Sequence, residues 1–169
     1  MNYLIMALRI IHIFAGIIWV GGTLMMTFFI SPTIGATAEA GQIFVGHLMS
    51  KMKFSQRMSA SAGLTILAGA ILFWIDSDGF TSAWTSSGAG QGFSIGAGFA
   101  MVGFVFGILI GRTTTAMAQL GAQFQGKPSP EQIAQMLVLG RQQGTYSNIA
   151  STMLILSVIF MSIARYFVF

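Results

Sequence analysis

Four long apolar stretches separated by polar segments set the pattern of this chain. They cover roughly residues 4–30, 58–75, 93–111 and 149–167. Each is long enough to cross the hydrocarbon core of a bilayer as a helix, which takes about 17 to 25 residues. We therefore predict an all-α polytopic membrane protein in which residues 1–169 form a single domain, a bundle of four transmembrane helices.

Two of the connections between these spans also have helical patterns. Within residues 38–53 the apolar side chains fall on one arc of a helix and the polar ones on the opposite arc. This pattern predicts an amphipathic helix on the membrane surface. Further on, Ser129 can cap a helix, Pro130 suits its first position and Glu131 suits its first turn. We expect a helix to begin there and to continue into the fourth span.

Small residues recur at three- and four-residue intervals along the third span. They are Gly92, Gly96, Ala100, Gly103, Gly107 and Gly111. A shorter ridge on the last helix consists of Gly140, Gly144, Ser147 and Ser151. Because small residues let membrane helices approach closely, we expect these two helices to be neighbours or to form a homodimer interface. The alternative is that the glycines make room for a flat cofactor.

Composition excludes a soluble or disordered chain, because 54% of the residues are hydrophobic and only 7% are charged. The absence of cysteine removes disulfides, thiolate metal ligands and c-type haem attachment. No serine is accompanied by a plausible general base, so the sequence gives no support to hydrolytic chemistry. The basic residues behind the net charge of +4 mostly lie beside spans, which argues against a nucleic-acid partner.

The basic residues also predict the orientation. The first and third connections contain Lys51, Lys53, Arg57, Arg112, Lys127 and Arg141. The middle connection contains Asp76 and Asp78 and no basic residue. By the positive-inside rule, both termini lie outside and the helical connections are cytoplasmic extensions of the bundle. We expect a multi-pass protein of the inner (plasma) membrane whose first span is retained rather than cleaved as a signal.

One stripe of the first span carries the candidate chemistry. Arg9, His12, Gly16 and Trp19 are spaced so that they share a helical face. An ionisable residue inside a span is a functional hypothesis by default. The histidine can ligate iron, the glycine can leave space for a macrocycle and the tryptophan can form a flat apolar wall. This stripe predicts haem b in the outer half of the bilayer.

Two arginines at the outer side fit the two propionates of a haem. Arg165 ends the fourth span at the same predicted depth as Arg9, and a guanidinium pairs well with a carboxylate. Met153 and Met161 on that span are possible second axial ligands. The structural alternative is that His12 only donates a hydrogen bond to a carbonyl of another helix, while the Arg9 side chain extends to the headgroups.

The second histidine and the methionines allow a different metal chemistry. His47 belongs to the cytoplasmic connection, most of a bilayer or about 30 Å from His12, so the two cannot share one haem. It is either an interfacial side chain or a ligand of a separate metal site. Thioethers favour Cu(I), and several methionines are expected near the cytoplasmic side. These are Met25, Met26, Met49, Met52 and Met58.

The pattern His12-x-x-x-Gly16-x-x-Trp19-x-Gly21-Gly22 resembles the first helix of the CopD-like group of small four-helix membrane proteins, which includes the HemJ-type protoporphyrinogen oxidases. The last helix, from Pro130 to Tyr166, is similar as well. The resemblance implies a b-type haem held by the first-helix histidine or, as in copper-resistance members, a role in copper passage across the inner membrane.

Together these observations predict an integral membrane haem b protein that transfers electrons to or from a quinone or a redox protein. Two alternatives stay open, a copper-binding or copper-transporting protein and a non-catalytic structural subunit of a membrane complex. The sequence does not decide whether the protein is an enzyme.

Overall fold

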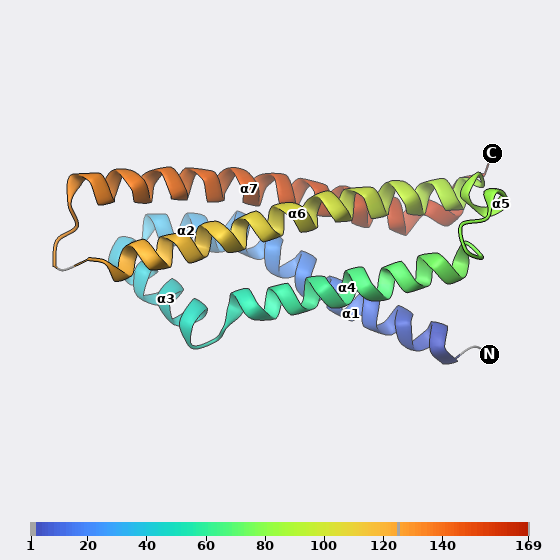
Figure 1. Ribbon diagram of the computed structural model, residues 1–169, viewed down its shortest axis with the longest axis horizontal. Coiled ribbons are helices and arrows are strands. Elements are labelled where there is room, and N and C mark those ends of the chain that lie inside the picture. Colours follow the sequence, from blue (N-terminus) through green and yellow to red (C-terminus); the bar gives the residue numbers. More distant parts are fainter. Residues whose placement is uncertain (1–2, 125, 169) are drawn as a thin grey trace.

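The computed structural model describes residues 3–124 and 126–168, and within these ranges it contains helices and no strand. Four helical stretches are long and apolar enough to span a membrane, at Tyr3–Ala36, Phe54–Asp76, Gly88–Ala122 and Pro130–Tyr166. The all-α four-helix prediction is therefore confirmed, although each helix is longer than its predicted apolar span. The start of the first span and the end of the last lie at the same end of the bundle (Figure 1).

The elements follow one another as a helical chain with short breaks. They are α1 (Tyr3–Met25), the π-helix η1 (Met26–Ile30), α2 (Ser31–Ala36), α3 (Ala38–Ser50), α4 (Phe54–Asp76), α5 (Ser82–Thr85), α6 (Gly88–Ala122), α7 (Pro130–Ile163) and the 3-10 helix η2 (Ala164–Tyr166). The amphipathic segment predicted at residues 38–53 is α3. The helix predicted to begin at Pro130 is α7, and it runs unbroken into the fourth span.

The start of α7 has the predicted cap. The Ser129 hydroxyl accepts a hydrogen bond from the backbone N–H of Gln132 at 3.3 Å. The Gln132 side chain in turn accepts one from the backbone N–H of Ser129 at 2.9 Å. This reciprocal capping box satisfies two backbone donors that a helix start leaves unpaired, so the chain enters α7 at a defined residue.

The first membrane helix continues past the predicted boundary at Ile30 by means of a π-turn. Pro32 has no N–H for the carbonyl of Phe28, and its ring crowds that carbonyl. The backbone widens just before it, and the Ser31 N–H donates to the carbonyl of Met26, five residues back. Helix α2 then follows in nearly the same direction (Figure 1). The proline therefore produces a local bulge instead of ending the helix.

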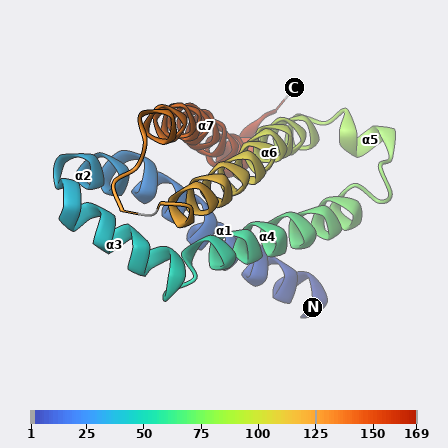
Figure 2. The ribbon, with the colours of Figure 1, turned by 60° about the vertical axis from the view of Figure 1, so that its left-hand side comes forward.

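The bundle consists of two closely packed helix pairs. Helix α1 crosses α4, and α6 lies beside α7 over most of its length (Figures 1 and 2). A buried core joins the two pairs and consists of Trp19 of α1, Ala62 of α4 and Leu154 of α7. The Trp19 ring packs edge-on against Phe104 of α6, with 6.1 Å between the ring centroids. Trp19 is thus the buried aromatic side chain at which the two helix pairs meet.

The glycine ridge of α6 has two different environments. A Cβ atom at Gly96 would lie 2.8 Å from Cγ of Met161, and one at Gly103 would lie 3.0 Å from the side chain of Leu154. This half packs against α7, which confirms that the two helices are neighbours. At Gly107 and Gly111 a Cβ would meet nothing within 4 Å. The half of the ridge that contains Gly107 and Gly111 therefore faces free space.

The shorter ridge on α7 also has two parts with different surroundings. A Cβ at Gly140 or Gly144 would meet nothing within 4 Å, so these two glycines do not mediate packing within the chain. Ser151 is fully buried, and its hydroxyl donates to the hydroxyl of Thr27 at 3.0 Å. Thr27 donates in turn to the carbonyl of Thr23. Homodimerisation through a glycine face stays a prediction.

We expect Ser151→Ala to lower the free energy of unfolding by about 1 kcal/mol. The substitution removes a hydrogen bond between α7 and η1, and such bonds between membrane helices are worth about 0.6 to 1.7 kcal/mol. Unfolding in mixed micelles with rising dodecyl sulfate measures the change. The matched control is Ser162→Ala, because the exposed Ser162 donates only to Val158 of its own helix. Equal stability losses in both variants would contradict a role for the Ser151 bond.

Candidate functional site

His12 lies on α1 at its contact with α4 and is half-buried. Its Nδ1 atom is 2.8 Å from the backbone carbonyl oxygen of Thr65. A carbonyl can only accept, so Nδ1 carries the hydrogen and donates it. In the neutral ring the other nitrogen, Nε2, then has its lone pair free. The contact with α4 thus fixes one tautomer and leaves one ligand atom.

Gly69 makes this contact possible, although it is not among the site residues predicted from the sequence. A Cβ at Gly69 would lie 2.8 Å from Cε1 and 2.9 Å from Nδ1 of His12. Any side chain there would displace the imidazole from the Thr65 carbonyl. The signal in the sequence was a glycine one turn after Thr65 in the second span, where a glycine weakens a helix unless it serves packing.

The structure does not place the rest of the stripe as a haem wall around His12. Gly16 faces α4, and a Cβ there would lie 3.6 Å from Cγ2 of Thr65, so this neighbour fills the expected space. Trp19 is only 5% exposed and belongs to the central core. Gly16 therefore serves the α1–α4 contact, and Trp19 lines a different part of the molecule.

The two arginines are at the same end of the bundle but have different surroundings. Arg9 is exposed and pairs with Asp76 at the end of α4, with Nη2 3.6 Å from Oδ2. An exposed pair of this length contributes little to stability, about 0 to 1 kcal/mol, and is easily exchanged. Arg165 lies in η2, is exposed and forms no ion pair with another described residue. The start of α1 and η2 lie on opposite sides of the bundle (Figures 1 and 2).

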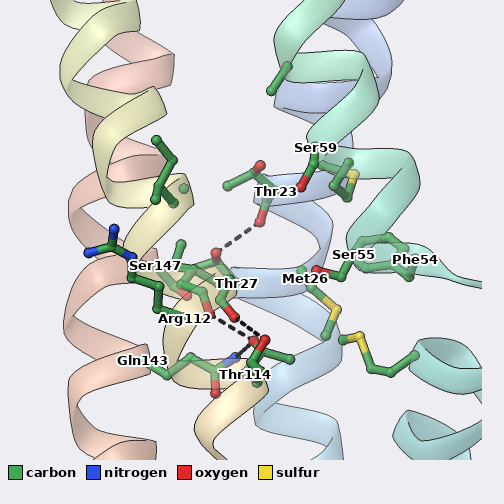
Figure 3. A pocket seen from close by; sticks show the side chains of 18 of the residues that line it. Thr23, Met26, Thr27, Phe54, Ser55, Ser59, Arg112, Thr114, Gln143 and Ser147 are labelled. Atoms are coloured by element: carbon green, nitrogen blue, oxygen red, sulfur yellow. Dashed lines mark hydrogen bonds between the residues drawn. The ribbon is translucent and has the colours of Figure 1, made fainter.

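A cavity of about 650 Å³ lies between the two helix pairs, toward the end that we predict to be cytoplasmic. All four membrane helices and α3 contribute to it, and Figure 3 shows its polar wall residues. The polar lining includes Thr23, Thr27, Ser55, Ser59, Thr114, Gln143 and Ser147, and the apolar lining includes Trp19, Phe54, Phe104, Met26, Met49 and Met58. His12 is not among these residues, so the histidine and the cavity are separate features.

A metal site built from histidines and carboxylates is not evident in the structure. Among the described residues no group of three or more His, Asp or Glu side chains comes together. His47 is exposed on α3, while Met49 of the same helix faces the cavity. Three of the methionines predicted to gather on the cytoplasmic side line this one cavity. They are Met26 of η1, Met49 of α3 and Met58 of α4.

No protein-family model, curated protein or solved structure matches the chain. The resemblance to the CopD-like group consequently stays a prediction that rests on the first-helix and last-helix patterns. His12 and the cavity are the two features of the molecule that bear on its function.

Proposed function

We propose that this protein is an integral membrane haem b protein in which Nε2 of His12 ligates the iron. The observation that carries the proposal is the hydrogen bond from Nδ1 to the Thr65 carbonyl. Histidines that bind metals commonly donate their other ring N–H to a backbone carbonyl, which fixes the tautomer and orients the ring. Thr65 and Gly69 supply that arrangement in the middle of the α1–α4 contact.

The surroundings of His12 fit a porphyrin on one side only. Thr65 fills the space at Gly16 and α4 covers the ring edge at Gly69, so a macrocycle has no room on that side. Elsewhere around His12 the α1 surface consists of exposed apolar side chains, including Ile11 and Ile13. Such a surface suits the apolar face of a porphyrin. We infer that lipid or a second copy of the chain would cover the other face.

Arg9 is the better placed of the two arginines to meet a propionate. It lies one turn from His12 on the same helix, and its bond to Asp76 is long and partly exposed. A propionate could replace Asp76 as its partner at small cost. Arg165 stays a second proposed partner at the same end of the bundle. Haem b, when bound, supplies a one-electron iron couple, which suits electron transfer with a quinone or a redox protein.

The visible spectrum of the purified protein tests this proposal. Protein expressed in haem-replete cells and solubilised in detergent is expected to show a Soret band and close to one haem per chain in a pyridine haemochromogen assay. Purified protein without a Soret band, both as isolated and after addition of hemin, would overturn the proposal.

Copper binding is a second candidate, favoured by the three thioethers that line the cavity. Met26, Met49 and Met58 come from three different elements, and soft thioether ligands select Cu(I). Metal analysis of the same preparation separates the candidates. One copper per chain without porphyrin, lost in a variant with all three methionines changed to leucine, would support copper. Neither metal nor haem, together with a larger copurifying complex, would support a structural subunit.

A further inference from the structure

The cavity contains little charge for a space of its size. Among its described lining residues Arg112 is the one charged side chain, and no carboxylate contributes. Figure 3 shows the Arg112 guanidinium directed away from Met26 and Phe54, and the residue is exposed. With neither a counter-ion for a cation nor an inward-pointing cation for an anion, the cavity suits an uncharged ligand.

Hydrogen-bond donors are present on both sides of the cavity. Ser55 and Ser59 are one turn apart on α4, and neither side-chain hydroxyl forms a hydrogen bond with another described residue. Gln143 lies across the space on α7, beside Thr114 of α6, whose own hydroxyl donates to the carbonyl of Ile110 at 2.8 Å (Figure 3). Gln143 uses one amide hydrogen to reach the Thr114 hydroxyl at 3.1 Å, which leaves its second amide hydrogen for a ligand.

The remaining walls are flat and apolar. Trp19, Phe54 and Phe104 are three aromatic rings that line the space, and a ring-shaped ligand can pack against such side chains. At Gly107 and Gly111 the α6 wall has no side chain, which leaves room for a ligand there. The volume of about 650 Å³ lies within the range of about 300 to 1,000 Å³ that is usual for small-molecule sites.

The cavity also reaches the surface of the bundle within the membrane helices. Ser59 is exposed on α4, and Ile108 of α6 is 45% exposed. Both line the cavity. A ligand that enters between these helices comes from the bilayer, so it must be soluble in lipid.

From these features we propose that the cavity binds a quinone. A quinone is uncharged, dissolves in the bilayer and carries carbonyl acceptors on opposite edges of a flat ring. These acceptors match the Ser55 and Ser59 hydroxyls on α4 and the Gln143 amide on α7. The site is independent of the proposed haem, because His12 does not line the cavity.

Tryptophan fluorescence provides the test. Trp74→Phe and Trp84→Phe leave Trp19, at the cavity wall, as the single emitter among the three tryptophans of the chain. Titration of this protein in detergent with a decyl-substituted benzoquinone is expected to give saturable quenching. The same titration can be made on protein purified without haem. The quinone proposal is therefore tested even if the haem proposal fails.

Gly107→Leu and Gly98→Leu are a matched pair for this titration. Both glycines are on α6 and a Cβ at either meets nothing within 4 Å, but only Gly107 lines the cavity. We expect Gly107→Leu to weaken quinone binding at least tenfold and Gly98→Leu to leave it within twofold. The double variant Ser55→Ala and Ser59→Ala, which keeps the volume, is expected to weaken binding about tenfold because it removes two donors.

Three results would overturn the quinone site. One is quenching that rises linearly without saturation, which indicates partition of the quinone into the micelle. Another is equal affinity in the Gly107→Leu and Gly98→Leu proteins, which would place the ligand elsewhere. The third is saturable quenching by Cu(I) with no saturable response to the quinone, which would assign the cavity to copper through its methionines.

Discussion

His12→Gln is expected to reduce the haem content of the purified protein at least tenfold, whereas His47→Gln leaves it unchanged. Loss of an orienting partner alone costs about 10- to 100-fold in metal affinity, and loss of the ligand itself should cost no less. The two histidines of the chain form a matched pair, because His47 is exposed on α3 and does not contact the α1–α4 interface. Soret absorbance per protein, with the pyridine haemochromogen assay, measures the change.

Glutamine is the informative substitution because it separates two roles of His12. Its flexible side chain carries an amide N–H that can reach the Thr65 carbonyl, whereas an amide is a poor iron ligand. Equal helical circular dichroism and equal elution from a sizing column establish that the variant folds. Full Soret absorbance in a folded His12→Gln protein would show that His12 is only a structural donor and would contradict the haem proposal.

The sequence was sufficient for features that depend on local chemistry or on hydropathy. The spans follow from apolar length, and the start of α7 follows from Ser129 and Pro130. The small-residue spacing that includes Gly96 and Gly103 predicted a close helix contact, and α7 makes that contact. Each of these signals lies within one helix and does not depend on which helix is its neighbour.

What the sequence could not show depends on contacts between helices. A stripe on a helix shows which residues share a face, but not which side chain of another helix occupies the space beside them. Thr65 therefore fills the space expected at Gly16, and Asp76 pairs with Arg9 at the predicted outer end. The first helix continues through Pro32 by means of a π-turn. From the sequence alone, a proline is normally evidence that a helix ends.

Helix α1 connects the two proposed sites. His12 and Trp19 are seven residues apart, about 10 Å along the helix axis at 1.5 Å per residue. The histidine contacts α4 toward the predicted outer side, and the tryptophan forms a wall of the cavity on the inner side. The η1 bulge continues directly from α1 and contributes Met26 and Thr27 to the same cavity. A haem and a quinone at these positions would be close neighbours across the core tryptophan.

The close approach of α6 and α7 gives the largest expected stability effect. We expect Gly96→Val to lower the free energy of unfolding by about 3 kcal/mol, near the upper end of what overpacking costs. A Cβ at Gly96 would lie 3.2 Å from the backbone nitrogen of Met161 and 3.3 Å from the carbonyl oxygen of Ser157, and a valine adds two methyl groups beyond it. Backbone atoms cannot move aside as a side chain can, so the two helices must separate. Dodecyl sulfate unfolding in mixed micelles, followed by tryptophan fluorescence, measures the loss.

Gly98→Val is the control for this substitution because it makes the same change in helix propensity on the same helix. Gly98 is exposed, and a Cβ there meets nothing within 4 Å, so its stability should change by less than about 0.5 kcal/mol. The difference between the two variants isolates the cost of moving α7 away from α6. If both variants unfold at the same dodecyl sulfate fraction, the α6–α7 contact cannot depend on the missing side chain at Gly96. In that event the glycine ridge would have to serve an interface outside the chain, which is the homodimer predicted from the same spacing.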